Sequence, residues 1–241
     1  MVTAASVFVA LDYPALEPAL ACATTLAPFG VRFKLGLELF CRCGPPGVAA
    51  LQGVTGPLLL DLKLHDIPRT VGRATAALCT LGAWGLTLHA AGGAAMLRAA
   101  VQAAQGGAGE PLRCLAVTVL TSLDEPALQA LGVRLPLREQ VASLTRLAQE
   151  AGCAGAVASP QEAAVVRAAA GPAFLVVTPG VRPAGVAAGD QARVATPQEA
   201  IAAGADALVV GRAVTAASDP PAALRRLLLA LGATAARAAP D

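Results

Sequence analysis

Short apolar runs alternate along the chain with longer segments in which apolar residues recur every three or four positions. Runs such as Leu58-Leu59-Leu60 predict strands of a parallel sheet whose outer face is covered by helices. The predicted strands are 6–11, 32–36, 58–63, 86–89, 112–118, 155–158, 174–178 and 207–210.

The segments between these runs predict helices. The clearest apolar stripes are Val141, Leu144, Leu147 and Ala151, and Leu224, Leu227, Leu228 and Leu231. Glycines stand where four helices should end, at Gly30, Gly82, Gly152 and Gly204. Eight strand–helix repeats without a low-complexity linker predict an α/β fold, a single (β/α)8 TIM barrel over residues 1–241. An open doubly wound sheet is the alternative, but it usually has a glycine-rich turn where this chain has Asp12-Tyr13-Pro14.

From the composition we expect neither a nucleic-acid partner nor a membrane span. The chain is 56% hydrophobic and 14% charged, with a net charge of +2 and no basic run, so we expect no nucleic-acid partner. Residues 74–97 carry no charged side chain, but glycines such as Gly82 and Gly85 interrupt them, so we expect no membrane span. The six cysteines are scattered, which favours reduced thiols and a cytoplasmic location.

Polar residues recur where the predicted strands end, and in a barrel these ends share the rim that carries the active site. They include Asp12, Lys34, Asp61, Lys63, His89, Thr121, Ser122, Ser159 and Arg212, while Pro179 and Gly211 follow the seventh and eighth strands. Asp61 and Lys63 stand two apart on one strand, so both should point into the barrel, and Lys34 from the neighbouring strand can pair with Asp61.

The chain has only two lysines, Lys34 and Lys63, against 16 arginines. Codon bias explains the general scarcity of lysine. The two that remain point to chemistry that arginine cannot perform, because an ammonium can give up its proton and a guanidinium essentially cannot. A purely structural ion pair is the alternative interpretation.

A second group of residues suggests a site for an anion. Gly211 and Arg212 follow the eighth strand at a predicted helix start, where backbone N–H groups and a guanidinium can hold a phosphate. Pro179, Arg182 and Gln191 lie upstream, within or beside the long irregular segment 181–196, which we interpret as a lid.

These residues together resemble the orotidine 5′-phosphate decarboxylase family along nearly the whole chain. The most specific match is the run Asp61-Leu62-Lys63-Leu64-His65-Asp66-Ile67-Pro68. Other matches are Ala10-Leu11-Asp12, Phe33-Lys34-Leu35-Gly36, Leu88-His89-Ala90, Leu120-Thr121-Ser122, 178–183, Asp190-Gln191 and Val210-Gly211-Arg212.

The resemblance implies decarboxylation of orotidine 5′-phosphate to uridine 5′-phosphate and CO₂ without metal or cofactor, by a homodimer with shared sites. It makes Lys63 the proton donor in a charge array with Lys34, Asp61 and Asp66. It implies that Asp66, Ile67 and Thr70 reach across the dimer interface. The remaining substrate contacts that it implies are Asp12 and Lys34 with the sugar, Thr121 and Ser122 with the base, and Pro179, Arg182, Gln191, Gly211 and Arg212 at the phosphate end.

Some features leave alternatives open. Leu64 and Arg69 depart from the usual family residues, and Arg69 lies beside the implied interface. The resemblance gives His65 and His89 no catalytic part. A magnesium-dependent relative acting on keto-sugar phosphates would need another acid from the second strand, where Glu38 lies beyond the strand end. A non-catalytic phosphate binder would not need the charge array.

Overall fold

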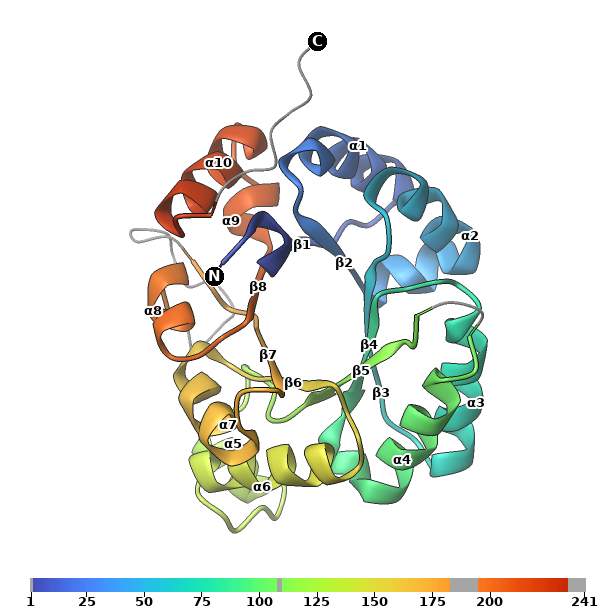
Figure 1. Ribbon diagram of the computed structural model, residues 1–241, viewed down its shortest axis with the longest axis vertical. Coiled ribbons are helices and arrows are strands. Elements are labelled where there is room, and N and C mark those ends of the chain that lie inside the picture. The colour runs from blue at the N-terminus through green and yellow to red at the C-terminus, as the bar shows by residue number, and fades with distance from the viewer. Residues whose placement is uncertain (1, 108–109, 183–194, 234–241) are drawn as a thin grey trace.

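The computed structural model describes residues 2–107, 110–182 and 195–233. Its strands pair in parallel in chain order and β1 pairs with β8, which closes the barrel. Figure 1 shows the strands as a central ring with the helices around it. The strands are β1 (Val7–Leu11), β2 (Arg32–Gly36), β3 (Leu59–Leu64), β4 (Gly85–His89), β5 (Arg113–Val117), β6 (Gly155–Val157), β7 (Leu175–Thr178) and β8 (Ala207–Val210). The predicted barrel is therefore confirmed, with strand ends that differ by no more than one residue from the prediction.

Helices follow the strands along the chain. The α-helices are α1 (Leu16–Leu26), α2 (Leu37–Thr55), α3 (Pro68–Cys79), α4 (Gly93–Ala104), α5 (Glu125–Ala130), α6 (Leu137–Glu150), α7 (Ala163–Ala170), α8 (Pro197–Ala202), α9 (Arg212–Thr215) and α10 (Pro220–Ala230). Short 3₁₀ turns are η1 (Ala4–Ser6), η2 (Ala27–Phe29), η3 (Ala90–Gly92) and η4 (Pro160–Glu162). The four glycines predicted to end helices all have positive φ, as at Gly152 with 87°.

Alternation along each strand divides the apolar residues between two layers. On β1, Val7, Val9 and Leu11 belong to the cluster beneath the helices, whereas Phe8 and Ala10 belong to the cluster inside the barrel. Leu60 and Leu62 likewise lie in the outer layer. The side chain between them on β3 therefore faces inward, as the sequence predicted.

An aromatic cluster fills the barrel at the N-terminal ends of the strands. The Trp84 ring lies 4.9 Å from the Phe8 ring, centroid to centroid. The guanidinium carbons of Arg32 and Arg113 lie 5.1 and 5.2 Å from the Trp84 ring centroid. This end of a barrel usually serves stability, which leaves the opposite rim for a site.

The structure also bears on residues 74–97 and on the six cysteines. Residues 74–97, which carry no charged side chain, divide into the end of α3, a turn, β4, η3 and the start of α4. Within the three described ranges, no helix is both long and apolar enough to cross a membrane. All six cysteines are free thiols, and Cys114 and Cys153 are buried.

Candidate active site

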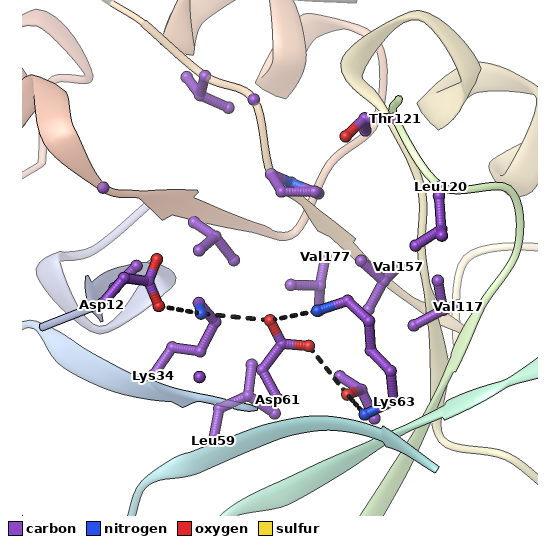
Figure 2. A pocket seen from close by; sticks show the side chains of 18 of the residues that line it. Asp12, Lys34, Leu59, Asp61, Lys63, Val117, Leu120, Thr121, Val157 and Val177 are labelled. Carbon is purple, nitrogen blue, oxygen red and sulfur yellow. Dashed lines mark hydrogen bonds and ion pairs between the residues drawn. The ribbon is translucent and has the colours of Figure 1, made fainter. Parts of the chain in front are cut away.

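A cavity of about 450 Å³ opens at the carboxyl ends of the strands. Its lining brings together most of the site residues predicted from the sequence: Asp12, Lys34, Asp61, Lys63, Thr121, Pro179, Arg182, Gly211 and Arg212. It also includes residues that the sequence did not single out, among them Leu37, Thr87, Val117, Leu120, Val157 and Val177. Figure 2 shows Asp12 and Lys34 on one side of this view, Val117 and Leu120 on the other, and Lys63 reaching between them next to Val157.

Four charged side chains form a continuous chain across the cavity floor. Lys34 Nζ lies 3.1 Å from Asp12 Oδ1 and 3.2 Å from Asp61 Oδ2. Lys63 Nζ lies 2.9 Å from the same Asp61 oxygen. Carboxylates and ammonium groups therefore alternate from Asp12 to Lys63 (Figure 2).

The middle of this chain is buried and its ends are open to the cavity. The side chains of Lys34 and Asp61 are 9% and 14% exposed, against 58% for Asp12 and 36% for Lys63. Buried ions of opposite sign in direct contact compensate each other's loss of hydration. Lys63 thus ends the array as a partly accessible ammonium held by a buried carboxylate.

The array favours the charged forms of its buried members. Burial alone would raise the pKa of the Asp61 carboxyl, but Lys34, Lys63 and the Thr87 hydroxyl hold that pKa below its ordinary value. Burial alone would lower the pKa of Lys34, but the carboxylates of Asp61 and Asp12 raise it above its ordinary value. Both groups are therefore ionised at neutral pH.

Strand β3 is irregular where it carries Lys63. Among the described residues, Lys63 is the one non-glycine residue with positive φ, at 49°. The β3–β4 register shifts between Leu60 and Leu64. Left-handed backbone at a residue with a side chain costs about 1–3 kcal/mol and clusters at functional sites. The prediction that Asp61 and Lys63 both reach the barrel interior is confirmed, although the strand between them is not regular.

The same cavity also has the residues predicted for an anion, which follow β7 and β8. Pro179, Arg182, Gly211 and Arg212 all line it. The Arg182 Nε is buried and has no hydrogen-bond partner among the described residues. The Arg182 N–H donates to the Ala195 carbonyl at 3.0 Å, which holds together the chain on either side of 183–194. Gln191 lies outside the described residues.

Four of the predicted contacts lie outside the cavity lining of this single chain. Ser122 is exposed beside Thr121. Asp66, Ile67 and Thr70 are exposed where β3 leads into α3, with Ile67 at 64%. The Asp66 Oδ1 accepts the Ile67 N–H at 2.6 Å. Within one chain, Asp66 is therefore not part of the charge array.

The histidines and Glu38 lie outside the cavity lining. The rings of His65 and His89 pack with centroids 5.3 Å apart, and burial, followed by the charges of His65 and Lys63, lowers the pKa of His89. Glu38, on α2, is exposed and lies 3.7 Å from Arg42 Nε. Across the described parts of the chain, no group of three or more His, Cys, Asp or Glu side chains is arranged to hold a metal ion.

Comparison with known proteins places this geometry in context. The model of the "Orotidine 5'-phosphate decarboxylase / HUMPS family" matches residues 5–227. Orotidine 5'-phosphate decarboxylase of Thermobifida fusca is 54% identical over 234 residues, 97% of this chain and 98% of that protein. The Anaeromyxobacter sp. enzyme of the same name is 54% identical over 222 residues, 92% of this chain and 96% of that protein. The crystal structure of orotidine 5'-phosphate decarboxylase from Lactobacillus acidophilus is 38% identical with a TM-score of 0.84, covering 94% of this chain and 99% of that one.

Proposed function

The chain belongs to the orotidine 5'-phosphate decarboxylase / HUMPS family, and from this we propose that it converts orotidine 5′-phosphate to uridine 5′-phosphate and CO₂. This reaction completes the de novo synthesis of pyrimidine nucleotides. The observation that carries the proposal is the chain of ion pairs that ends in the Lys63 ammonium on the cavity floor. We expect the enzyme to act in the cytoplasm, without metal or cofactor.

Different groups of cavity residues fit the different parts of the substrate. Arg182 and Arg212 supply cationic side chains for the phosphate, with Gly211 and Pro179 beside them. We assign Gln191 to the same phosphate. The valine-rich wall opposite the charge array fits the flat pyrimidine, and Thr121 and Ser122 would contact its edge. Asp12 and Lys34 would bind the ribose between these two parts.

In the proposed reaction, the bond between the pyrimidine ring and its carboxylate breaks and CO₂ leaves. The electron pair remains on the ring carbon, and Lys63 Nζ donates a proton to that carbon. Enzymatic catalysis of so slow a reaction requires lowering the barrier by on the order of 20 kcal/mol. A preorganised ammonium stabilises the negative charge as it develops, and Asp61 both holds Lys63 and lies next to the departing carboxylate.

The first test is the loss of orotidine 5′-phosphate absorbance on addition of purified protein treated exhaustively with a chelator. We expect rapid decarboxylation, and we expect Lys63→Ala to lower kcat at least about 100-fold. Arg226→Ala, at an exposed position on α10, is the control. No turnover by folded wild-type protein would overturn the proposed function. A Lys63→Ala variant with wild-type kcat would instead overturn only the assignment of the proton donor.

We further propose a homodimer in which Asp66, Ile67 and Thr70 complete the partner's site. Ile67 supports this, because a 64% exposed isoleucine beside the rim is an apolar side chain available for an interface. Lys63→Ala and Asp66→Ala subunits should each be nearly inactive alone. Mixed dimers should regain activity, because one of their two sites would then combine an intact Lys63 with an intact Asp66. No recovery on mixing would show that both residues act within one subunit.

A further inference from the structure

The Thr87 hydroxyl connects the two central residues of the active site. Thr87 lies on β4, is 1% exposed and lines the cavity. Its Oγ1 accepts the backbone N–H of Lys63 at 2.9 Å and donates to Asp61 Oδ1 at 2.9 Å. The dashed lines at the lower right of Figure 2 mark these contacts.

The first of these bonds compensates for the irregularity of β3. In a regular parallel pair, backbone groups of neighbouring strands bond to each other. The β3–β4 register shifts between Leu60 and Leu64, and Lys63 has a φ of 49°. At this point the Thr87 hydroxyl accepts the hydrogen bond from the Lys63 N–H, so a side chain replaces a backbone acceptor.

The second bond fixes the carboxylate that holds the Lys63 ammonium. Asp61 Oδ2 contacts both Lys34 Nζ and Lys63 Nζ, which leaves Oδ1 to the Thr87 hydroxyl. Because the Lys63 N–H already donates to Thr87 Oγ1, the hydroxyl proton points towards Asp61. One buried side chain thus fixes both the backbone of Lys63 and the carboxylate that pairs with its ammonium.

We infer that Thr87 is a positioning residue for the decarboxylation, holding Lys63 where its ammonium reaches the reacting carbon. This inference rests on the proposed function. The Thr87 hydroxyl bonds to Asp61 and to the backbone of Lys63, so we expect it to matter for the chemical step and little for binding of the phosphate, base or ribose. Displacement of a catalytic group by about 1 Å can lower the rate on the order of 100-fold.

The test compares three variants. Thr87→Val keeps the shape and loses the hydroxyl, and Thr87→Ser keeps the hydroxyl. Thr75→Val is the matched control, because Thr75 on α3 is fully buried and its hydroxyl has no partner among the described residues. We expect Thr87→Val to lower kcat about 10- to 100-fold with KM within about 3-fold of wild type. Thr87→Ser should restore most of kcat, and Thr75→Val should leave it unchanged.

Two readouts separate this inference from the proposed function. Wild-type protein without decarboxylase activity would refute the function itself. A crystal structure of Thr87→Val, which needs no activity, should show Lys63 displaced from its left-handed backbone or its ammonium moved away from Asp61. Wild-type kcat in Thr87→Val, failure of Thr87→Ser to restore kcat, or an unchanged Lys63 in the variant structure would each overturn the role of Thr87.

Discussion

Lys34 Nζ lies 3.2 Å from Asp61 Oδ2, and both side chains are buried at the carboxyl ends of neighbouring strands. This contact joins the exposed carboxylate of Asp12 to the Lys63 ammonium through two groups that water barely reaches. The energetic balance of the active site therefore depends on a buried pair whose members are each costly without the other.

Removal of Lys34 should accordingly affect both stability and activity. Lys34→Met would leave Asp61 with one ammonium partner instead of two, and we expect the free energy of unfolding to fall by about 2–4 kcal/mol. Urea denaturation measures this change. In the double variant Lys34→Met/Asp61→Asn the stability should recover in part, because the uncompensated charge is gone. Equal stability of Lys34→Met and wild type would contradict the coupling.

The same pair predicts a pH dependence of stability. The folded-state pKa of Asp61 lies below that of the unfolded chain because Lys34, Lys63 and Thr87 outweigh the effect of burial. The ionised carboxylate therefore stabilises the fold above the unfolded pKa of about 3.9, and this contribution disappears as pH falls through the folded value. The stability gap between wild type and Asp61→Asn should be constant near neutral pH and should narrow below about pH 4. A gap that stays constant to pH 3 in urea titrations would refute the lowered pKa.

Much of the charge array from Asp12 to Lys63 could be predicted from the sequence, and there is a physical reason why the rest could not. The ends of β2 and β8 agree with the predicted bounds, and on β8 the apolar run is followed directly by Gly211. The alternation of Leu60, Asp61 and Leu62 correctly predicted which side chain faces inward. Such local patterns predict where each strand lies and which of its side chains face inward. That is enough to predict that charged residues far apart in the sequence meet at one rim.

Thr87 and the backbone of Lys63 are features that local sequence patterns cannot predict. A threonine within a predicted strand is ordinary, and a lysine in an Asp-x-Lys run gives no sign of positive φ. At this left-handed position the Lys63 N–H bonds to a side chain of another strand, a contact that depends on the tertiary register. The proposed contribution of Asp66 to a partner's site likewise depends on a second chain and stays a prediction.

Gly36 provides a test of how tightly Asp12 is placed. A Cβ at Gly36 would lie 2.5 Å from Asp12 Oδ1 and 3.2 Å from Lys34 Nζ. Gly36→Ala should therefore displace Asp12 and raise the KM for orotidine 5′-phosphate, by about 10-fold if one charge-assisted hydrogen bond to the ribose is lost. Gly53→Ala on α2 is the matched control, since its Cβ would meet nothing within 4 Å. The control should keep its KM and gain about 0.5–1 kcal/mol of stability. An unchanged KM in Gly36→Ala would argue against ribose binding by Asp12.

Substitution of Arg167 should lower the stability of the protein without changing catalysis. Its guanidinium donates to the carbonyls of Gly171, Pro172, Phe174 and Gly204 and to Asp206 Oδ2. Asp206 in turn accepts the Val176 N–H at 2.8 Å. These contacts join the chain segments that enter β7 and β8, on the side of the barrel opposite the active site.

Arg167→Ala should lower the free energy of unfolding by about 2–4 kcal/mol, because four carbonyls, three of them in part-buried hydrogen bonds, lose a charged donor. Arg167→Lys should recover only part of this loss, since one ammonium cannot reproduce a planar fork of five donors. Below the melting temperature, kcat and KM should equal those of wild type in both variants, because none of the hydrogen-bond partners of this guanidinium among the described residues lines the cavity. Thermal melts and steady-state kinetics on the same preparations check both parts. A fall in kcat at full stability would mean that the entry to β7 and β8 is coupled to Arg182 and Arg212 at their other ends.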